Sequence, residues 1–169
     1  MIVELDEHEI DVFLRRCVIG RIGCHADGHT YVVPVVYVWE GECVYVQSIE
    51  GRKIRMMRAN PQVVFEVDEY ESDSGSWQSV IVEGVYEELE GSRAEAALTL
   101  LVRRFVGGRR TDGDRSTGRK PVTFRIRATR TTGRRVTRTP VARAVTWLGI
   151  AINRRRARRS ARRPGQRIP

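Results

Sequence analysis

A short turn between a predicted strand and a predicted helix carries the clearest chemistry of this sequence. Gln47 and Ser48 close the strand, and Gly51 comes directly before a helix-like segment that begins with Arg52 and Lys53. Backbone N–H groups at a helix N-terminus, the helix dipole and neighbouring cations together attract an anion, most naturally a phosphate group. A solvated helix start with a basic first turn would show the same residues, so the turn alone leaves both interpretations open.

Six runs of β-forming residues surround this turn and must position it. They span residues 18–24, 31–39, 43–47, 62–68, 77–86 and 121–128, and tight turns join the first three. Such turns connect neighbouring antiparallel strands. Residues 5–16, 52–58 and 92–105 are expected to form helices. The sequence therefore predicts a mainly β fold: a small six-stranded antiparallel barrel, closed or half closed, with two or three flanking helices.

The second run, residues 31–39, is apolar on both faces and contains a proline at position 34. A strand that is apolar on both faces has to be covered on both sides, for instance by a partner subunit or a ligand. Proline removes one donor from the hydrogen-bonding ladder. We therefore expect this strand to be interrupted, bulged or at an edge near Pro34, with backbone groups free for another contact.

Charge is divided unevenly along the chain. The formal net charge is +9, yet residues 1–102 hold 8 basic and 19 acidic side chains, whereas residues 103–169 hold 22 basic and 2 acidic ones. We expect a folded domain over residues 1–138, a short apolar helix over 139–153, and a disordered Arg-rich tail over 154–169. The tail could contact nucleic acid or an anionic membrane nonspecifically, dock on its own acidic barrel, or have no selected role.

The cysteines and histidines do not form a recognisable metal-binding pattern. Cys17, Cys24 and Cys43 contain no CxxC spacing, and His25 and His29 flank a predicted turn. No metal site is predicted, and the thiols are expected to be buried and reduced. The acidic residues after Met1 do not resemble a secretory signal, so we expect a cytoplasmic protein.

Seven short motifs follow one another in a familiar order. They are Gly-Arg at 20–21, Val-Pro-Val at 33–35, Ser-x-x-Gly-Arg-Lys at 48–53, Asn-Pro at 60–61, Trp-x-Ser-Val-x-Val-x-Gly at 77–84, Phe-Arg-Ile at 124–126 and Thr-Gly-Arg-Arg at 132–135. Over about residues 5–136 this order resembles the pyridoxamine 5′-phosphate oxidase-like flavoproteins, the FMN-binding split barrels. The nearest branch resembles the one that contains the nitroimidazole-resistance proteins.

The resemblance implies a cofactor role for the turn described first. In such a protein, Arg52 and Lys53 would hold the FMN phosphate with Ser48 nearby, and Gln47 would face the ribityl chain or the ring. The nitroimidazole-resistance branch commonly carries a histidine where this chain has Gln47, so the same nitro-reduction mechanism does not carry over. No catalytic side chain is assigned, because the flavin itself performs the redox chemistry.

Further residues are assigned through the same resemblance. The backbone around Val33, Pro34 and Val35 would border the isoalloxazine ring. Trp77 and Ser79 would approach from the side or from a partner subunit, since the family implies a homodimer with FMN at the interface.

The resemblance implies an FMN-dependent oxidoreductase that passes hydride or electrons from a reduced nicotinamide to a small-molecule acceptor. The substrate motif of true pyridoxamine 5′-phosphate oxidases is not visible near the C-terminus. Relatives of the barrel bind deazaflavin or haem, so these are alternative cofactors. A non-enzymatic binding module with a basic interaction tail is the alternative of another class.

Overall fold

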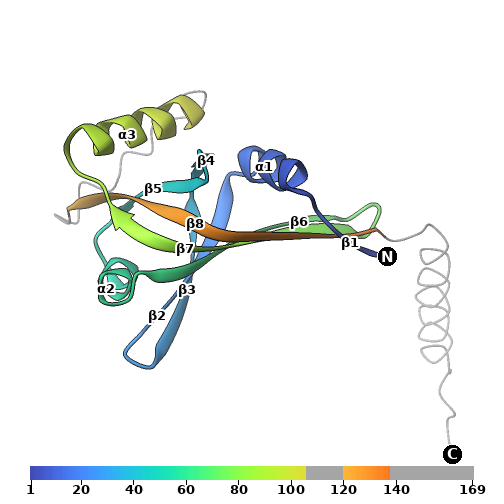
Figure 1. The fold of residues 1–169 in the computed structure, drawn as a ribbon, viewed down its shortest axis with the longest axis horizontal. Helices are drawn as coiled ribbons and strands as arrows, with labels where there is room; N and C mark the ends of the chain where they lie inside the picture. Colours follow the sequence, from blue (N-terminus) through green and yellow to red (C-terminus); the bar gives the residue numbers. More distant parts are fainter. Residues whose placement is uncertain (106–119, 138–169) are drawn as a thin grey trace, which may run out of the picture.

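A single antiparallel sheet, flanked by three helices, forms the described part of the chain (Figure 1). The structure is a computed structural model that describes residues 1–105 and 120–137. The elements in chain order are β1 (Ile2–Glu4), α1 (Glu7–Arg16), β2 (Ile19–Ala26), β3 (His29–Val36), β4 (Val38–Glu40), β5 (Cys43–Ile49), α2 (Arg52–Ala59), β6 (Gln62–Glu71), β7 (Ser76–Glu88), α3 (Gly91–Phe105) and β8 (Pro121–Val136). Within these described ranges no helix has the length and hydropathy needed to span a membrane.

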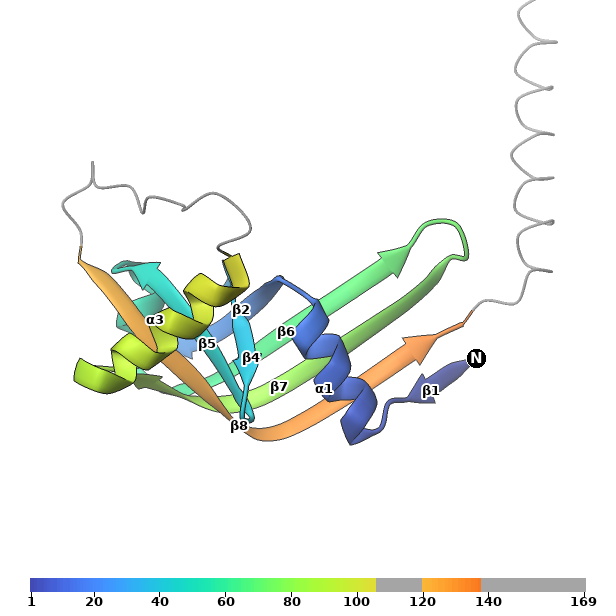
Figure 2. The same ribbon diagram turned by 90° about the horizontal axis from the view of Figure 1, so that it is seen from above.

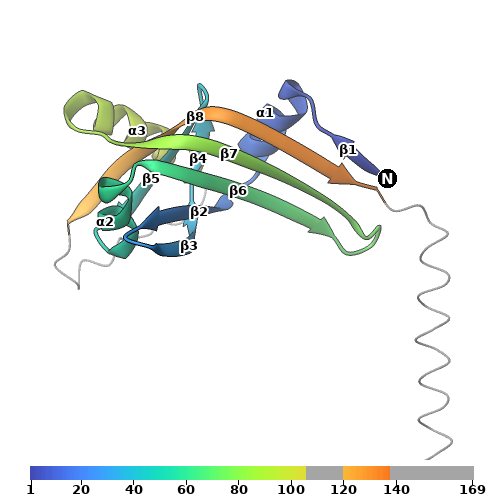
Figure 3. The ribbon, with the colours of Figure 1, turned by 60° about the horizontal axis from the view of Figure 1, so that its bottom comes forward.

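The order of the strands explains why this barrel is split. The sheet runs β3-β2-β6-β7-β8-β5-β4, with β1 paired to β8. Strands β3 and β4 are consecutive in the chain yet lie at opposite ends of this order. The sheet must therefore curl until its two ends approach each other, and Tyr37 links them without closing the hydrogen-bonding ladder. Figure 3 shows the curvature of the long strands β6, β7 and β8.

The predicted mainly β split-barrel fold is confirmed, but the predicted number of six strands is wrong. The sheet has eight strands: β1 and β4 are only three residues long, and the 31–39 run is divided at Tyr37 into β3 and β4. Because this run is apolar on both faces, its sequence does not show where one strand ends and the next begins. The Tyr37 hydroxyl is buried and donates a hydrogen bond to the Leu14 carbonyl oxygen at 2.7 Å, which anchors the link beneath α1.

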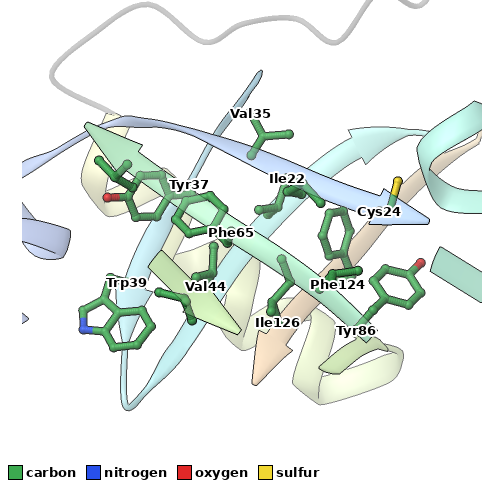
Figure 4. Packing of buried hydrophobic residues seen from close by; sticks show 14 of the residues in the cluster. Ile22, Cys24, Val35, Tyr37, Trp39, Val44, Phe65, Tyr86, Phe124 and Ile126 are labelled. Atoms are coloured by element: carbon green, nitrogen blue, oxygen red, sulfur yellow. The ribbon is translucent and has the colours of Figure 1, made fainter. Parts of the chain in front are cut away.

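Alternating side chains build the core inside the curved sheet (Figure 4). In β2, Ile22 and Cys24 are buried while Arg21 and His25 are exposed, the period-two pattern of a strand with one covered face. Tyr37 meets Phe65 edge to face at a centroid separation of 4.8 Å. Helix α2 adds its buried residues to the same core cluster, so the position of its first turn is fixed by packing.

The opposite face of the sheet exposes several large apolar side chains. Register pairs Ile19 with Val36, Gly23 with Val32 and with Val64, and Glu66 with Ile81, so all of these lie on one face. Ile19 and Val32 are each 59% exposed. Gly23 contributes to a hollow of about 530 Å³ on this face. We call this surface the outer face.

Beyond the barrel the sheet continues as an arm made of β6, β7 and β8, with β1 paired to β8, and Figure 2 shows it extending away from β2 and β5. We call it the β6–β7 arm, after the hairpin at its tip. Tyr70 pairs with Trp77 near the tip of the arm. The pairing of β7 with β8 shifts register between Glu83 and Gly84. A register shift of this kind bends a strand pair.

Two of the predicted segments, the apolar helix over 139–153 and the Arg-rich tail over 154–169, lie outside the described residues. Their structure and the partners predicted for the tail stay predictions.

Candidate functional site

The start of helix α2 lacks the features that normally complete a helix N-terminus. Gly51 is its N-cap and makes no side-chain capping hydrogen bond, and the first turn contains no acidic residue. Instead that turn presents Arg52, Lys53 and Arg55. The first N–H groups of a helix have no partner within the helix, and the positive end of its dipole repels cations. Without an anion, this arrangement is electrostatically unfavourable.

Lys53 lies on the packing face of the helix. Met56 and Met57 follow it by three and four residues, so all three side chains share one side, and both methionines are buried in the core. At this position an apolar residue would continue the packed stripe. The lysine is half-buried, and desolvation lowers the pKa of its ammonium below the ordinary value. Because burying the charged ammonium group of Lys53 here costs free energy, its presence indicates a role other than packing.

The cations of this first turn have no acidic partners within residues 1–105 and 120–137. None of Arg52, Lys53 and Arg55 forms a salt bridge there, whereas Arg58 at the other end of the helix forms two. The thiol of Cys24 on β2 interacts electrostatically with Lys53: burial raises the pKa of Cys24, and Arg52 and Lys53 lower it in part. The site therefore offers unneutralised positive charge.

Tyr31 on β3 fixes the direction of Arg52. The Arg52 guanidinium carbon lies 4.9 Å from the centre of the Tyr31 ring, a cation–π contact. Tyr31 pairs with Cys24 across the β2–β3 ladder. One residue pair thus connects the first turn of α2 to both strands, and the cations of α2 lie beside the same strand that carries Pro34.

The structure brings most of the predicted site residues to this end of the barrel. Val33, Pro34 and Val35 lie on β3, the edge of the sheet, as the proline predicted, although the strand continues through it without a break. Pro34 is exposed and Val35 is buried.

Two further predicted residues, Gln47 and Ser48, lie near the end of β5, where they pair with Thr123 and Val122. Gln47 is exposed, whereas the Ser48 hydroxyl is half-buried and lies 3.4 Å from the Ile49 carbonyl oxygen.

Trp77 and Ser79 are not brought to α2 within one chain. They lie on the β6–β7 arm, where register places them opposite Tyr70 and Asp68. Figures 1 and 3 both show the tip of the arm at the opposite end of the molecule from α2 and from the β2–β3 hairpin. Trp77, at 39% exposed, lines a second hollow of about 500 Å³ together with Arg16 and Arg135.

The two histidines near Cys24 make local contacts that stabilise the hairpin. His25 Nδ1 lies 3.0 Å from Thr30 Oγ1, and His29 Nδ1 lies 2.8 Å from the Asp27 carbonyl oxygen. Among the described residues, no three His, Cys, Asp or Glu side chains gather as metal ligands.

A phosphate group fits the α2 turn, since it would supply the negative charge that the N-cap and first turn lack. The family model described as pyridoxamine 5′-phosphate oxidase matches residues 6–135. The chain belongs to this family. The resemblance inferred from the motif order is thereby confirmed. Family membership and the structure together establish the split-barrel fold, while the function has to be argued from the residues present.

Known proteins of similar structure differ in what they are described as binding. An FAD-binding protein from Mesorhizobium loti is 32% identical, with a TM-score of 0.67 over 81% of this chain and 99% of that one. A Bacteroides thetaiotaomicron protein named for 5-nitroimidazole antibiotic resistance shares the fold at 20% identity, with a TM-score of 0.65 over 80% and 87% of the two chains. A haem-binding protein from Mycobacterium smegmatis shares it at 16% identity, with a TM-score of 0.54 over 72% and 50%.

A curated relative from Rhizobium meliloti, described as an uncharacterized protein, is 37% identical over 75 residues. The match spans 44% of this chain and about half, 49%, of that protein.

Sequence reasoning identified Arg52 and Lys53 but missed Tyr31, Arg55 and Arg58. The spacing of Lys53 to the two methionines indicates that the lysine lies on the apolar face of the helix, where a charged residue is unusual and points to a function. The contact between Arg52 and Tyr31 had no comparable signal, since the two residues come from separate elements.

Proposed function

We propose that this member of the pyridoxamine 5′-phosphate oxidase family binds a flavin through its phosphate at the first turn of α2. The observation that carries the proposal is the uncapped helix start with three cations that have no acidic partner in the described structure. A phosphate would accept hydrogen bonds from the first N–H groups of the helix and pair with Lys53 and Arg52. It would also offset the desolvation that lowers the pKa of Lys53.

FMN is the smallest flavin that carries a phosphate group, and FAD carries a diphosphate attached at the same position of the ribityl chain. The description of the Mesorhizobium loti protein as FAD-binding makes FAD a second ligand to test. When bound, a flavin supplies hydride and electron transfer. The chain would contribute phosphate binding at α2, a border for the ring along Val33 to Val35, and polar contacts from Gln47 and Ser48. The electron donor proposed is a reduced nicotinamide, and the acceptor is a small molecule.

A second copy of the chain would complete the site. The outer face exposes Ile19, Val32 and Val64 on adjoining strands, an apolar surface of the kind that subunit interfaces cover. Trp77 and Ser79 lie on the same face, further along β7, because Ser79 is two residues from Ile81 on one strand. A two-fold packing of outer faces would let each partner's arm reach the other's β3. The homodimer is therefore part of the proposal.

The three cysteines are all free, two of them buried, as suits a reducing compartment such as the cytoplasm. We include a cytoplasmic location in the proposal on this ground.

The test is the visible absorption spectrum of the purified protein, followed by titration with FMN and FAD. We expect a bound oxidised-flavin spectrum, and we expect Lys53→Met to weaken flavin binding about a hundredfold, since it removes a charge-assisted phosphate contact from a half-buried site. Riboflavin, which has no phosphate, should bind to the wild-type protein and to Lys53→Met with equal affinity.

Arg93→Met is the matched control, because Arg93 is an exposed arginine on α3. It should leave flavin affinity unchanged. If the wild-type protein binds neither flavin, or binds deazaflavin or haem in their place, the flavin assignment is wrong.

A further inference from the structure

Arg58 sits at the far end of α2 and connects two acidic residues that come from different elements. Its Nε and Nη2 atoms bind the Glu88 carboxylate at 2.5 and 3.1 Å, a bidentate contact at the end of β7. Its Nη1 atom binds the carboxylate of Glu50. The Tyr86 hydroxyl donates to Glu88 Oε1 at 2.7 Å, so the acid that holds the guanidinium is itself held by a buried tyrosine.

Glu50 is the acidic residue nearest in sequence to the cations of the first turn. It directly precedes the N-cap Gly51, two residues before Arg52 and three before Lys53. A partly exposed carboxylate at this position is close in sequence to unpaired cations and to the positive end of the helix dipole, both of which would attract it. It is nevertheless paired with Arg58, eight residues further along the chain.

We propose that Arg58 is a positioning residue that holds the Glu50 carboxylate away from the first turn of α2, so that Arg52 and Lys53 stay free for the phosphate of the cofactor. The inference rests on the flavin function proposed above. In this role the Glu88–Arg58–Glu50 network keeps the negative charge of Glu50 away from the phosphate site.

The network is arranged as this role requires. Glu88 takes two of the donors of the guanidinium and fixes its plane, which leaves Nη1 directed at Glu50. The backbone N–H of Glu50 donates to the Lys120 carbonyl oxygen at 3.0 Å, so the main chain of this turn is held separately from its side chain. Loss of Arg58 should therefore release the Glu50 side chain while the turn stays in place.

A released Glu50 would compete with the phosphate for the same cations. Because the site is partly exposed, the effect of one additional carboxylate is moderate and depends on salt. We expect Arg58→Gln to raise the dissociation constant for FMN about fivefold at low ionic strength, and less at high ionic strength.

The experiment measures FMN affinity by quenching of flavin fluorescence in wild-type protein, R58Q, E50Q and the double variant R58Q/E50Q. If Arg58 acts by holding Glu50, the double variant should bind FMN within about twofold of E50Q, because the competing charge is gone. Riboflavin affinity should not change in any of them. Thermal unfolding of each variant shows that it is folded.

Arg15→Gln is the matched control for the loss of a paired arginine. Arg15 also bridges two acids, Asp11 at 2.8 Å and Glu40 at 2.6 Å, and its side chain is 44% exposed against 43% for Arg58. It lies on α1, so R15Q should leave FMN affinity unchanged.

The outcomes separate this inference from the proposed function. Wild-type protein that binds no flavin overturns both. Wild-type protein that binds FMN while R58Q binds it equally well overturns the role of Arg58 alone. A loss in R58Q that E50Q does not rescue, or one that extends to riboflavin, shows a purely structural role for Arg58 and also overturns the inference.

Discussion

Helices α1 and α2 are both short and amphipathic, and both bury one side in the same core, yet they begin in opposite ways. Asp6 caps α1 through a reciprocal capping box with Glu9, with hydrogen bonds of 2.8 and 3.1 Å, and its first turn is acidic. The α2 helix has a glycine cap without a side-chain bond and a basic first turn. Only α1 follows the rules for a helix that has to be stable by itself.

This difference between the two helix starts shows that α2 lacks stabilising interactions that α1 has. A capping residue is worth about 1 kcal/mol, and a charge that matches the dipole adds up to about the same again. The chain makes both contributions at the start of α1 and neither at the start of α2. A helix start that departs from both rules and also carries a half-buried lysine is typical of a binding site.

Of the changes that test this difference between the two helix starts, replacing the half-buried Lys53 should have the largest effect on flavin binding. In Lys53→Met, flavin binding should fall about a hundredfold while the flavin-free protein becomes more stable by about 1 kcal/mol, because an unpartnered polar group leaves a partly desolvated position. Chemical denaturation with and without FMN measures both changes. A variant that loses stability together with binding would show that Lys53 serves the fold.

The same variant has a defined pH dependence. Since the pKa of Lys53 is lowered on folding, the folded protein binds this proton less tightly than the unfolded chain does. The stability of flavin-free wild-type protein relative to Lys53→Met should therefore be lowest below the folded pKa. It should recover as pH rises toward 10.5, the ordinary value for lysine.

Giving α2 the kind of cap that α1 has should sharpen the contrast. A Cβ at Gly51 would meet only the Ile49 carbonyl oxygen, at 3.9 Å, and the backbone there is extended, so a side chain fits. Gly51→Asp should stabilise flavin-free protein by about 0.5 kcal/mol and weaken FMN binding about tenfold, because the carboxylate takes the N–H groups that a phosphate would use. Gly51→Ala, which adds no acceptor, is the control. Equal FMN affinity in Gly51→Asp and Gly51→Ala would contradict the proposal that the phosphate binds at the start of α2.

Removing the cap of α1 should change stability alone. Asp6→Ala should lower the free energy of unfolding by about 1 kcal/mol and leave flavin affinity unchanged. Denaturant unfolding and FMN titration of one preparation check this. Glu7→Gln, an acid of the same turn outside the capping box, should have a smaller effect on stability.

The smallest effect should come from the aromatic contact that directs Arg52. Tyr31→Leu should weaken FMN binding about threefold, the scale of one partly exposed cation–π interaction. Tyr31→Phe keeps the ring and should bind like the wild-type protein. A large loss in both variants would mean that the hydroxyl group contacts the ligand.

Local sequence patterns predicted the long strands and the three helices, because period-two and helical spacing reflect the single covered face of each element. The three-residue strands β1 and β4 carry too few residues to show a period, and they exist through pairing with β8 and β5. Tyr37 was read as part of a strand, since only its buried contact with Leu14 sets it apart.

The site was predictable to the extent that it is local. Residues 47–53 form one continuous segment, the end of β5, a turn and the start of α2, so their proximity follows from the chain itself. The place of Trp77 and Ser79 depends on the length of the β6–β7 arm and on what faces it. No pattern along the chain shows this, and one chain does not bring them to α2.

Strand β3 ends one side of the sheet with eight residues, of which the valines Val32 and Val36 are exposed. An open edge of this kind is a template on which another strand can add, and repeated addition leads to aggregation. Pro34 lies in the middle of this edge and cannot donate a backbone hydrogen bond, so a strand added there would meet a gap in the ladder. Pro34, which we propose borders the flavin ring, thus also protects the protein from self-assembly in the time before a cofactor or a partner covers this edge.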